Sequence, residues 1–176
     1  LDKRRIRRGI AVRFGMGAAP DSWDALLTAM THKGYTKQEL ISAGLAVNGK
    51  NGRLYDKFRN RLMLPVIDVR GDVVGFGSRV LDKSEPKYMN TPETLTYSKR
   101  RILYGMNLAK KSKRSNIILC EGNLDVVTLH QAGFDNAVAS MGTALTQEQL
   151  RLLSRYTKEL VLCYDCLLYT SDAADD

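Results

Sequence analysis

The stretch Ile117-Ile118-Leu119-Cys120-Glu121 is a short apolar run that ends on a carboxylate, and it is the most informative feature of the sequence. The same pattern returns about forty residues later in Leu160-Val161-Leu162-Cys163-Tyr164-Asp165. Apolar runs of this length are typical of buried parallel strands, and open α/β sheets bind ligands at the carboxyl ends of their strands. Two strand ends that each carry a carboxylate therefore predict a site for a divalent metal and chemistry on phosphates.

The composition is that of a globular protein with a basic surface. The 176 residues are 44% hydrophobic and 26% charged, and the net charge is +8. No apolar run approaches the roughly 18 residues of a membrane span, so no membrane association is expected. Basic residues cluster at Lys3–Arg8, at Lys57, Arg59 and Arg61, at Lys99–Arg101 and at Lys110–Arg114. Four basic clusters favour a polyanion partner such as nucleic acid or nucleoside triphosphates, although a solvated surface explains any one of them.

Three cysteines without a secretory signal indicate reduced thiols in a cytoplasm. Cys163 and Cys166 form a C-x-x-C pair, but His32 and His130 lie far away without metal spacing, so no zinc site is expected. Cys120 and Cys163 are predicted to be buried strand residues.

Two architectures follow one another along the chain. Residues 1–112 predict an α+β N-terminal subdomain, with a basic helix in residues 1–15, a helix capped by Asp21-Ser22 with Trp23 in the core, and a capping box at Thr36–Glu39. Residues 62–69 and 73–81 predict a hairpin, residues 86–93 an irregular loop, and residues 102–113 a helix. Gly75 and Gly77 predict either a bulge or a place where a ligand or another backbone comes close.

Residues 113–165 predict an α/β subdomain. The order is strand, helix, strand, helix, strand, with a capping box at Thr146–Gln149, which is typical of a parallel sheet with right-handed crossovers. We place the boundary between the two subdomains near residue 112.

Several of these segments resemble one family. Residues 121–127 (EGNLDVV) and 137–146 (AVASMGTALT) resemble the toprim core of DnaG-type bacterial primases. Upstream, residues 13–17, 58–65, 75–81 and 86–94 are similar, in the same order, to the RNA polymerase domain of that family. The resemblance covers roughly residues 5–165 and implies an α+β subdomain followed by an incomplete α/β toprim subdomain.

The resemblance also implies roles for individual residues. Glu121 and Asp165 correspond to metal ligands, with Glu121 also a candidate acid/base, and Asp125 corresponds to an acidic residue beside the site. The residues matching the template and nucleotide channel are Arg13, Arg79, Lys87, Tyr88, Asn90 and Lys99. The implied cofactor is Mg²⁺ or Mn²⁺. The implied partners are a single-stranded DNA template, ribonucleoside triphosphates and a replicative helicase, which binds through a C-terminal module missing here.

Structural roles remain open for several of these residues. Glu121 and Asp125 also suit the start of a helix, where carboxylates complement the helix dipole. Tyr88 is either a base-stacking or a packing aromatic, and His130 is expected to be structural.

The sequence departs from the family pattern after Asp165. Leu167 stands where the family has its second aspartate, and residues 166–176 resemble translated sequencing-adapter read-through, so we interpret them as a non-native tail. The metal site is then incomplete and the last strand an exposed edge, and the chain as written is expected to have little or no primer synthesis.

The sequence is compatible with three functions. The first is the truncated catalytic core of a primase, a DNA-directed RNA polymerase that makes short RNA primers by metal-dependent nucleotidyl transfer. The second is a non-catalytic module that binds single-stranded DNA. The third is another toprim enzyme, a nuclease or a topoisomerase, which the upstream matches disfavour.

Overall fold

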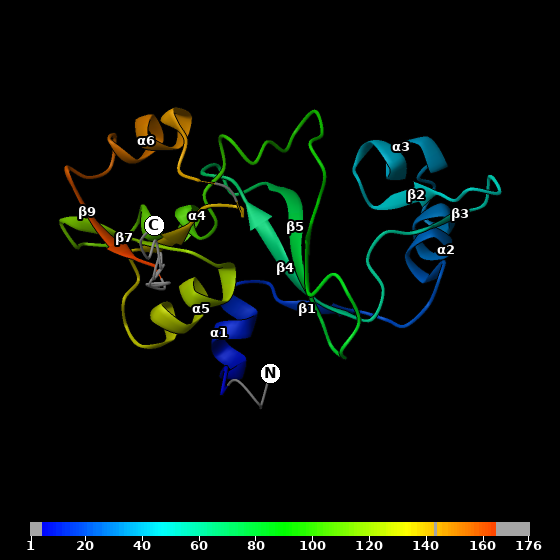
Figure 1. The fold of residues 1–176 in the computed structure, drawn as a ribbon, viewed down its shortest axis with the longest axis horizontal. Coiled ribbons are helices and arrows are strands. Elements are labelled where there is room, and N and C mark those ends of the chain that lie inside the picture. The colour runs from blue at the N-terminus through cyan, green and yellow to red at the C-terminus, as the bar shows by residue number, and fades with distance from the viewer. Residues whose placement is uncertain (1–4, 143, 165–176) are drawn as a thin grey trace, which may run out of the picture.

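The computed structural model describes residues 5–142 and 144–164 and contains three sheets. Figure 1 shows them along the longest axis, with a small lobe of α2, α3, β2 and β3 at one end. The antiparallel strands β4 and β5 lie in the middle, and the parallel sheet with α4, α5 and α6 lies at the other end. None of the helices in the described residues is long and apolar enough to cross a bilayer.

The central sheet is built on the predicted hairpin. Its strands, in spatial order, are β1 (Gly17–Ala19), β4 (Arg61–Ile67), β5 (Val73–Val80) and β6 (Tyr88–Asn90), all antiparallel. The hairpin of β4 and β5 is confirmed, with a bulge between Val66 and Ile67. The predicted irregular loop is wrong at Tyr88–Asn90, because these residues pair with Gly77–Arg79 and satisfy backbone groups that β5 would otherwise expose.

The small lobe combines a hairpin with two helices. Its elements are α2 (Ala25–His32), α3 (Lys37–Ser42), β2 (Ala46–Asn48) and β3 (Leu54–Asp56). The capping box of α3 is confirmed, because the Thr36 hydroxyl accepts from Glu39 N at 3.2 Å and Thr36 N donates to the Glu39 carboxylate at 2.7 Å.

The predicted cap of α2 is wrong. Neither Asp21 nor Ser22 reaches the first turn of the helix; instead the Asp56 carboxylate, at the end of β3, accepts from Leu26 N at 2.7 Å and Leu27 N at 2.9 Å. Asp56 is only 2% exposed. A buried carboxylate from a neighbouring strand therefore caps the N-terminus of this helix, in place of a residue just before it.

Trp23 is not a core residue, contrary to the expectation. Its side chain is 60% exposed, lies edge-on to Tyr55 at 5.4 Å between ring centroids, and carries the Arg59 guanidinium 4.2 Å above its ring centroid. Stacking of the Arg59 guanidinium covers part of the ring.

The parallel sheet follows the predicted order of elements. β7 (Asn116–Cys120) is the middle strand, with β8 (Ala137–Ala139) on one side and β9 (Glu159–Cys163) on the other, both parallel to it. The helices of this half are α5 (Asn123–Gln131) and α6 (Gln147–Leu153), and Thr146 caps α6 through Gln149 at 3.1 Å as predicted.

Within the described residues β9 is an edge strand, as expected, and the predicted burial of its Cys163 is wrong. It pairs only with β7, and Leu162 is 63% exposed. Cys120 is fully buried as expected, whereas Cys163 is exposed because no strand covers it. Asp165, Cys166 and the predicted non-native tail lie outside the described residues.

The helix predicted for residues 102–113 is much shorter than expected. Only α4 (Met106–Ala109) forms, because Tyr104 exchanges backbone hydrogen bonds of 2.8 and 3.1 Å with Ala139 at the edge of β8. Gly105 then turns the chain at φ +81°, and a Cβ there would come within 2.8 Å of Val126 Cγ1.

One hydrophobic core joins the two halves. Phe14 is the C-terminal cap residue of α1 (Arg8–Arg13). It is buried together with Leu64 of β4 in the same cluster as Leu124 and Val127 of α5. The subdomain boundary near residue 112 stays a prediction, since this shared core crosses it.

His130 of α5 is structural, as expected. It is 3% exposed, its Nε2 lies 3.0 Å from the Ala137 carbonyl oxygen, and the Phe14 ring meets it edge-on at 5.0 Å. Burial lowers the pKa of His130, against the opposing hydrogen bond to Ala137, and the charge of Arg13 lowers it further.

We predict that Asp56→Ala destabilises the fold by about 1–3 kcal/mol, because two amide groups at the start of α2 lose their acceptor. The free energy of unfolding from urea titration measures this. Asp21→Ala is the matched control and should cost less than about 0.5 kcal/mol. Equal losses in the two variants would contradict the cap.

We also predict that stability falls as the pH drops below about 6.5, the ordinary imidazole pKa. The pKa of His130 is lowered in the folded state, so the unfolded chain binds the proton more readily, and the stability present above that pH is lost below it. His130→Gln should flatten the curve, measured by urea titration from pH 7.5 to 5. His32→Gln, in the exposed last turn of α2, should leave it unchanged.

Candidate active site and nucleic-acid interface

Glu121 lies at the carboxyl edge of the parallel sheet. Cys120 pairs in register with Ala139 of β8 and Cys163 of β9, so the three strands end together and Glu121 is the first exposed residue after β7. The edge borders an open hollow of about 670 Å³. Its lining residues are Glu121, Ser140, Gly142, Ala144, Leu145, Leu162 and Tyr164.

The Glu121 carboxylate is available to a ligand. It forms no ion pair with any residue in the described ranges, and it contributes, after burial and Cys120, to raising the pKa of Tyr164 across the hollow. An exposed carboxylate at a strand end has the oxygen donors that Mg²⁺ and Mn²⁺ prefer. Glu121 therefore fits the predicted metal as one ligand, but the described residues hold no cluster of three or more acidic, cysteine or histidine ligands.

The second predicted ligand, Asp165, lies outside the described residues. Cys163 is the last residue of β9 and pairs with Cys120. The pairing of the two carboxylates that the sequence predicts thus stays a prediction.

Asp125 closes the first turn of α5. Its carboxylate accepts from Gly122 N at 3.1 Å, and its charge lies at the positive end of the helix dipole. The structural role that the sequence left open is therefore present, and the predicted role beside the metal stays a prediction.

The Cys120 thiol is not a candidate metal ligand at this edge of the sheet. Burial, with smaller contributions from Cys163 and Asp125, raises its pKa to about 12, so the sulfur stays protonated near neutral pH. Its function is to fill the centre of the sheet.

Three of the predicted nucleic-acid residues form one cluster, here called the tyrosine platform: Arg79, Lys87 and Tyr88. Arg79 of β5 lies opposite Tyr88 of β6 in register and donates to its hydroxyl at 3.3 Å. The Arg79 guanidinium and the Lys87 ammonium lie 5.4 and 5.8 Å from the ring centroid. The ring is 53% exposed, and neither cation forms an ion pair within the described residues. An exposed ring with two cations near it is suited to a base and its phosphates.

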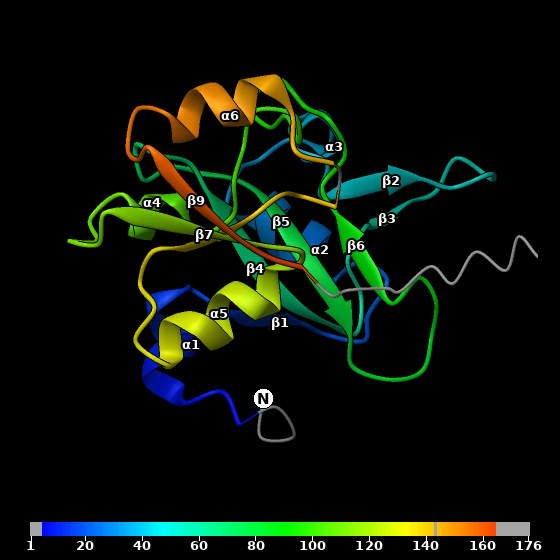
Figure 2. The ribbon, with the colours of Figure 1, turned by 60° about the vertical axis from the view of Figure 1, so that its left-hand side comes forward.

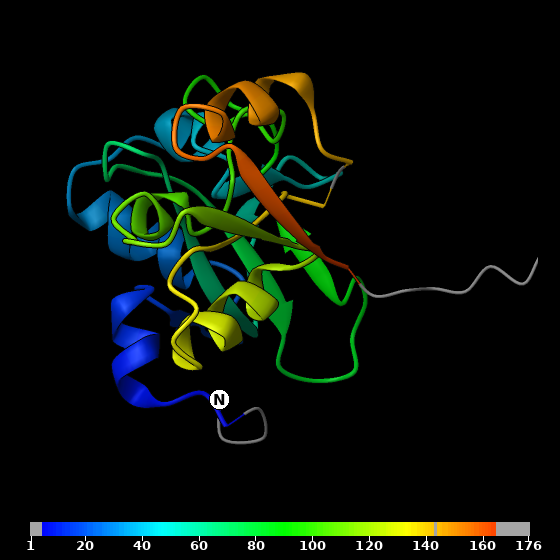
Figure 3. The same ribbon diagram turned by 90° about the vertical axis from the view of Figure 1, so that its left-hand side faces the viewer.

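Asn90 links this platform to the carboxyl edge of the parallel sheet. Its side-chain amide donates to the Met141 carbonyl oxygen at 3.3 Å, just after β8, while its backbone pairs with Gly77. Figure 2 accordingly shows β6 beside the ends of β7 and β9. The 90° view of Figure 3 shows the same neighbourhood of β6 and β9.

Asn123 is a residue at this junction that the sequence did not single out. A Cβ at Gly77 would lie 2.5 Å from the Asn123 amide nitrogen and 3.2 Å from the Asn90 amide oxygen, so both amides occupy the space that the glycine leaves. The sequence predicted a bulge or the approach of a ligand or another backbone at this glycine, and the structure instead brings two side-chain amides there. The sequence signal that could have identified Asn123 as the partner of Gly77 was its position, two residues after Glu121.

Arg13 and Lys99 are not brought into the platform. The charge of Arg13 acts on His130, near the end of α5 opposite to Glu121. The charge of Lys99, after burial, lowers the pKa of Lys57, and its backbone amide donates to Glu93 at 2.8 Å. Both stay predictions as nucleic-acid contacts.

Comparison with known proteins places the geometry in a family. The family model described as the DNA primase catalytic core, N-terminal domain, matches residues 1–110, and a toprim-like model matches residues 118–166. A DNA primase of Clostridium acetobutylicum is 52% identical over 163 residues, 92% of this chain and 27% of the relative. A DNA primase of Escherichia coli K12 is 42% identical over 167 residues, 94% of this chain and 29% of the relative.

Solved structures agree. The E. coli primase catalytic core superposes with a TM-score of 0.88 at 42% identity, over 93% of this chain and 53% of that chain. A DnaG primase catalytic domain bound to single-stranded DNA superposes with a TM-score of 0.87, also at 42% identity, over 93% and 54%. The chain thus spans 27–29% of the length of these two curated relatives. With a family model over residues 1–110 and a toprim-like model after it, the chain belongs to the family of DNA primase catalytic cores.

Proposed function

We propose that this chain is catalytic-core sequence of a bacterial DNA primase, which synthesises short RNA primers on single-stranded DNA from ribonucleoside triphosphates. The observation that carries the proposal is the contact between Asn90 and Met141, which holds the tyrosine platform beside the edge that bears Glu121. A replicative helicase, bound through sequence outside this chain, and a bacterial cytoplasm complete the proposed setting.

Nucleotidyl transfer joins a 3′-hydroxyl to the α-phosphate of a nucleotide and releases pyrophosphate. Glu121, together with Asp165, would hold the divalent ion. Bound Mg²⁺ or Mn²⁺ would activate the hydroxyl and neutralise charge on the leaving pyrophosphate. In the proposal, Arg79 grips a phosphate bidentately, Lys87 adds a point charge, and the Tyr88 ring stacks on a base.

The alternative function is a non-catalytic module that binds single-stranded DNA. Such a module would use the tyrosine platform and would not need a metal ion at Glu121. Metal binding separates the two functions without an activity measurement. A test that needs no activity measurement is required, because we expect little primer synthesis from the chain as written, which has Leu167 in place of the family's second aspartate.

We predict that Glu121→Gln weakens Mn²⁺ binding by at least about tenfold, since losing a group that merely supports a ligand already costs roughly 10–100-fold. Isothermal titration calorimetry or the electron paramagnetic resonance of free Mn²⁺ measures this. Glu159→Gln, at the amino end of β9, is the matched control and should bind Mn²⁺ as the parent does. Unchanged binding in Glu121→Gln would remove Glu121 from the metal site.

We predict that Lys87→Ala weakens binding to single-stranded DNA and reduces the slope of log K against log salt by about 0.7, the value for one lost phosphate contact on a single strand. Fluorescence anisotropy with a labelled oligothymidylate, from 50 to 300 mM NaCl, measures the slope. Lys37→Ala, on the exposed start of α3, is the control and should leave the slope unchanged. An unaltered slope in Lys87→Ala would exclude Lys87 as a phosphate contact.

A further inference from the structure

Two adjoining hollows lie where the β4–β5 turn, the loop before α4, and α6 meet. Their volumes are about 290 and 470 Å³, and both are lined by Arg101 and Ile102. We call them together the arginine hollow. Among the residues that the structure describes, it shares no lining residue with the hollow at Glu121, so it is separate from the proposed catalytic edge.

Aliphatic side chains form part of the lining of the arginine hollow. Leu103 and Met106 line its first part and Val73 and Leu95 its second. Val73 is 56% exposed and Leu95 is 99% exposed. Exposed aliphatic side chains gathered around a hollow and rimmed by charge are typical of a surface that a partner covers.

Each acidic residue of the rim has an arginine partner, and Asp68 and Asp72 share one. Arg70 pairs with Asp68 at 3.1 Å and with Asp72 at 3.4 Å, and Arg100 pairs with Glu148 at 3.6 Å.

Three arginines remain on the rim: Arg101, Arg151 and Arg155. All three are exposed, and none forms an ion pair with another residue of the described ranges. The charge of Arg151 acts on Glu148 and that of Arg101 on Glu93, so both arginines are partly compensated without a direct ion pair. The two lining sets together hold four arginines and three carboxylates, and the positive charge that is left is complementary to an anionic partner.

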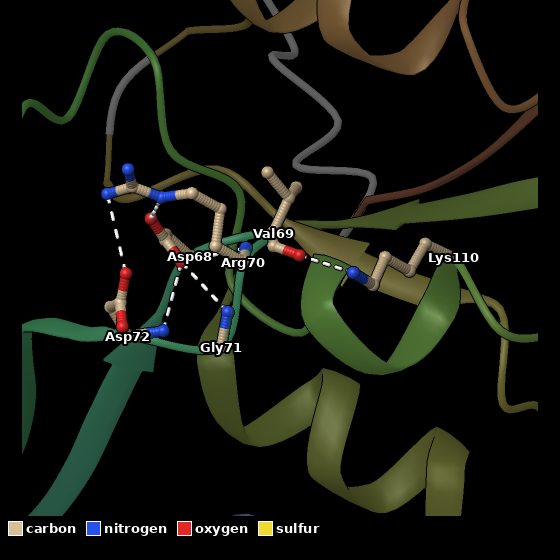
Figure 4. Close-up of polar contacts among 6 residues, drawn as sticks. All are labelled: Asp68, Val69, Arg70, Gly71, Asp72 and Lys110. Atoms are coloured by element: carbon tan, nitrogen blue, oxygen red, sulfur yellow. Dashed lines mark hydrogen bonds and ion pairs between the residues drawn. The ribbon is translucent and has the colours of Figure 1, made fainter.

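One wall of the hollow is preformed. Figure 4 shows the β4–β5 turn, in which Asp68 Oδ1 accepts from the backbone amides of Arg70 at 2.8 Å and of Gly71 and Asp72 at 3.0 Å. The Lys110 ammonium also donates to the Val69 carbonyl oxygen and ties the turn to the end of α4. A wall held by this many hydrogen bonds loses little conformational entropy when a partner binds.

We propose that the arginine hollow docks an acidic peptide segment of a protein partner, with an aliphatic or aromatic side chain against Val73 and Leu95 and carboxylates on Arg101, Arg151 and Arg155. No aromatic side chain lines either part of the hollow in the described residues, so a nucleotide base finds no ring to stack on. A phosphate backbone would pair with the arginines but leave Val73 and Leu95 in water, whereas a peptide satisfies both features.

The test uses the 176-residue chain and the fluorescein-labelled peptide Asp-Asp-Phe-Asp-Asp-Leu-Asp-Asp, with binding followed by fluorescence anisotropy. The double variant Arg151→Glu, Arg155→Glu should weaken binding on the order of tenfold, because attraction becomes repulsion on the rim. Arg8→Glu, an equally exposed arginine on α1, is the matched control and should change binding less than about twofold. Arg155→Gln, which removes charge alone, serves as a second variant if the double variant fails to fold.

Two comparisons decide between peptide and polynucleotide. Replacing the phenylalanine and leucine of the peptide by serine should weaken binding on the order of fivefold. In the protein, Leu95→Ser should weaken binding of the original peptide, whereas the exposed control Val12→Ser should leave it unchanged. No peptide binding, equal losses with Arg8→Glu, or no effect of the serine peptide would overturn the proposal. So would a loss of oligothymidylate binding in the double variant with peptide binding intact. None of these readouts depends on primer synthesis or on Glu121.

Discussion

The burial of β7 is the constraint on which the rest of the structure depends. The strand is hydrogen-bonded along both edges, and Leu119 and Cys120 have no exposed surface. A strand in this position tolerates no charged side chain along its length, because a buried charge without a partner is costly. The first carboxylate therefore comes after the strand, at Glu121, and the neighbouring strands end at the same edge.

The second constraint is the seam between the antiparallel and parallel halves. Phe14 and Leu64 share a core with Leu124 and Val127, and Asn90 bonds to Met141 across the same seam. Gly77 permits this contact because its missing Cβ leaves room for the amides of Asn90 and Asn123. The proposed template platform and the proposed metal ligand are thus held by one packed interface rather than by a flexible connection.

The positive charge of the chain is divided between surfaces of different chemistry. On the tyrosine platform, Arg79 and Lys87 flank an exposed ring, which suits bases and phosphates. In the arginine hollow, Arg151 and Arg155 line the same surface as aliphatic side chains, which suits a peptide. Net charge alone predicted a polyanion partner and did not distinguish these surfaces, since only the neighbours of each cation tell them apart.

The sequence by itself determined the features that depend on local signals. Hydrophobic period and capping boxes predicted the hairpin, the order of strands and helices after residue 115, and the helix starts at Thr36 and Thr146. They also predicted the position of Glu121, because a carboxylate directly after a buried strand needs no knowledge of distant residues.

Only the tertiary structure decided the features that depend on residues far apart in the chain. Asp56 caps α2 from another strand, Tyr104 leaves its expected helix to pair with Ala139, and Asn123 meets Gly77. The exposure of Trp23 is of the same kind. Each of these is set by which backbone groups, cavities and side chains other elements bring near, and local propensity carries no information about those partners.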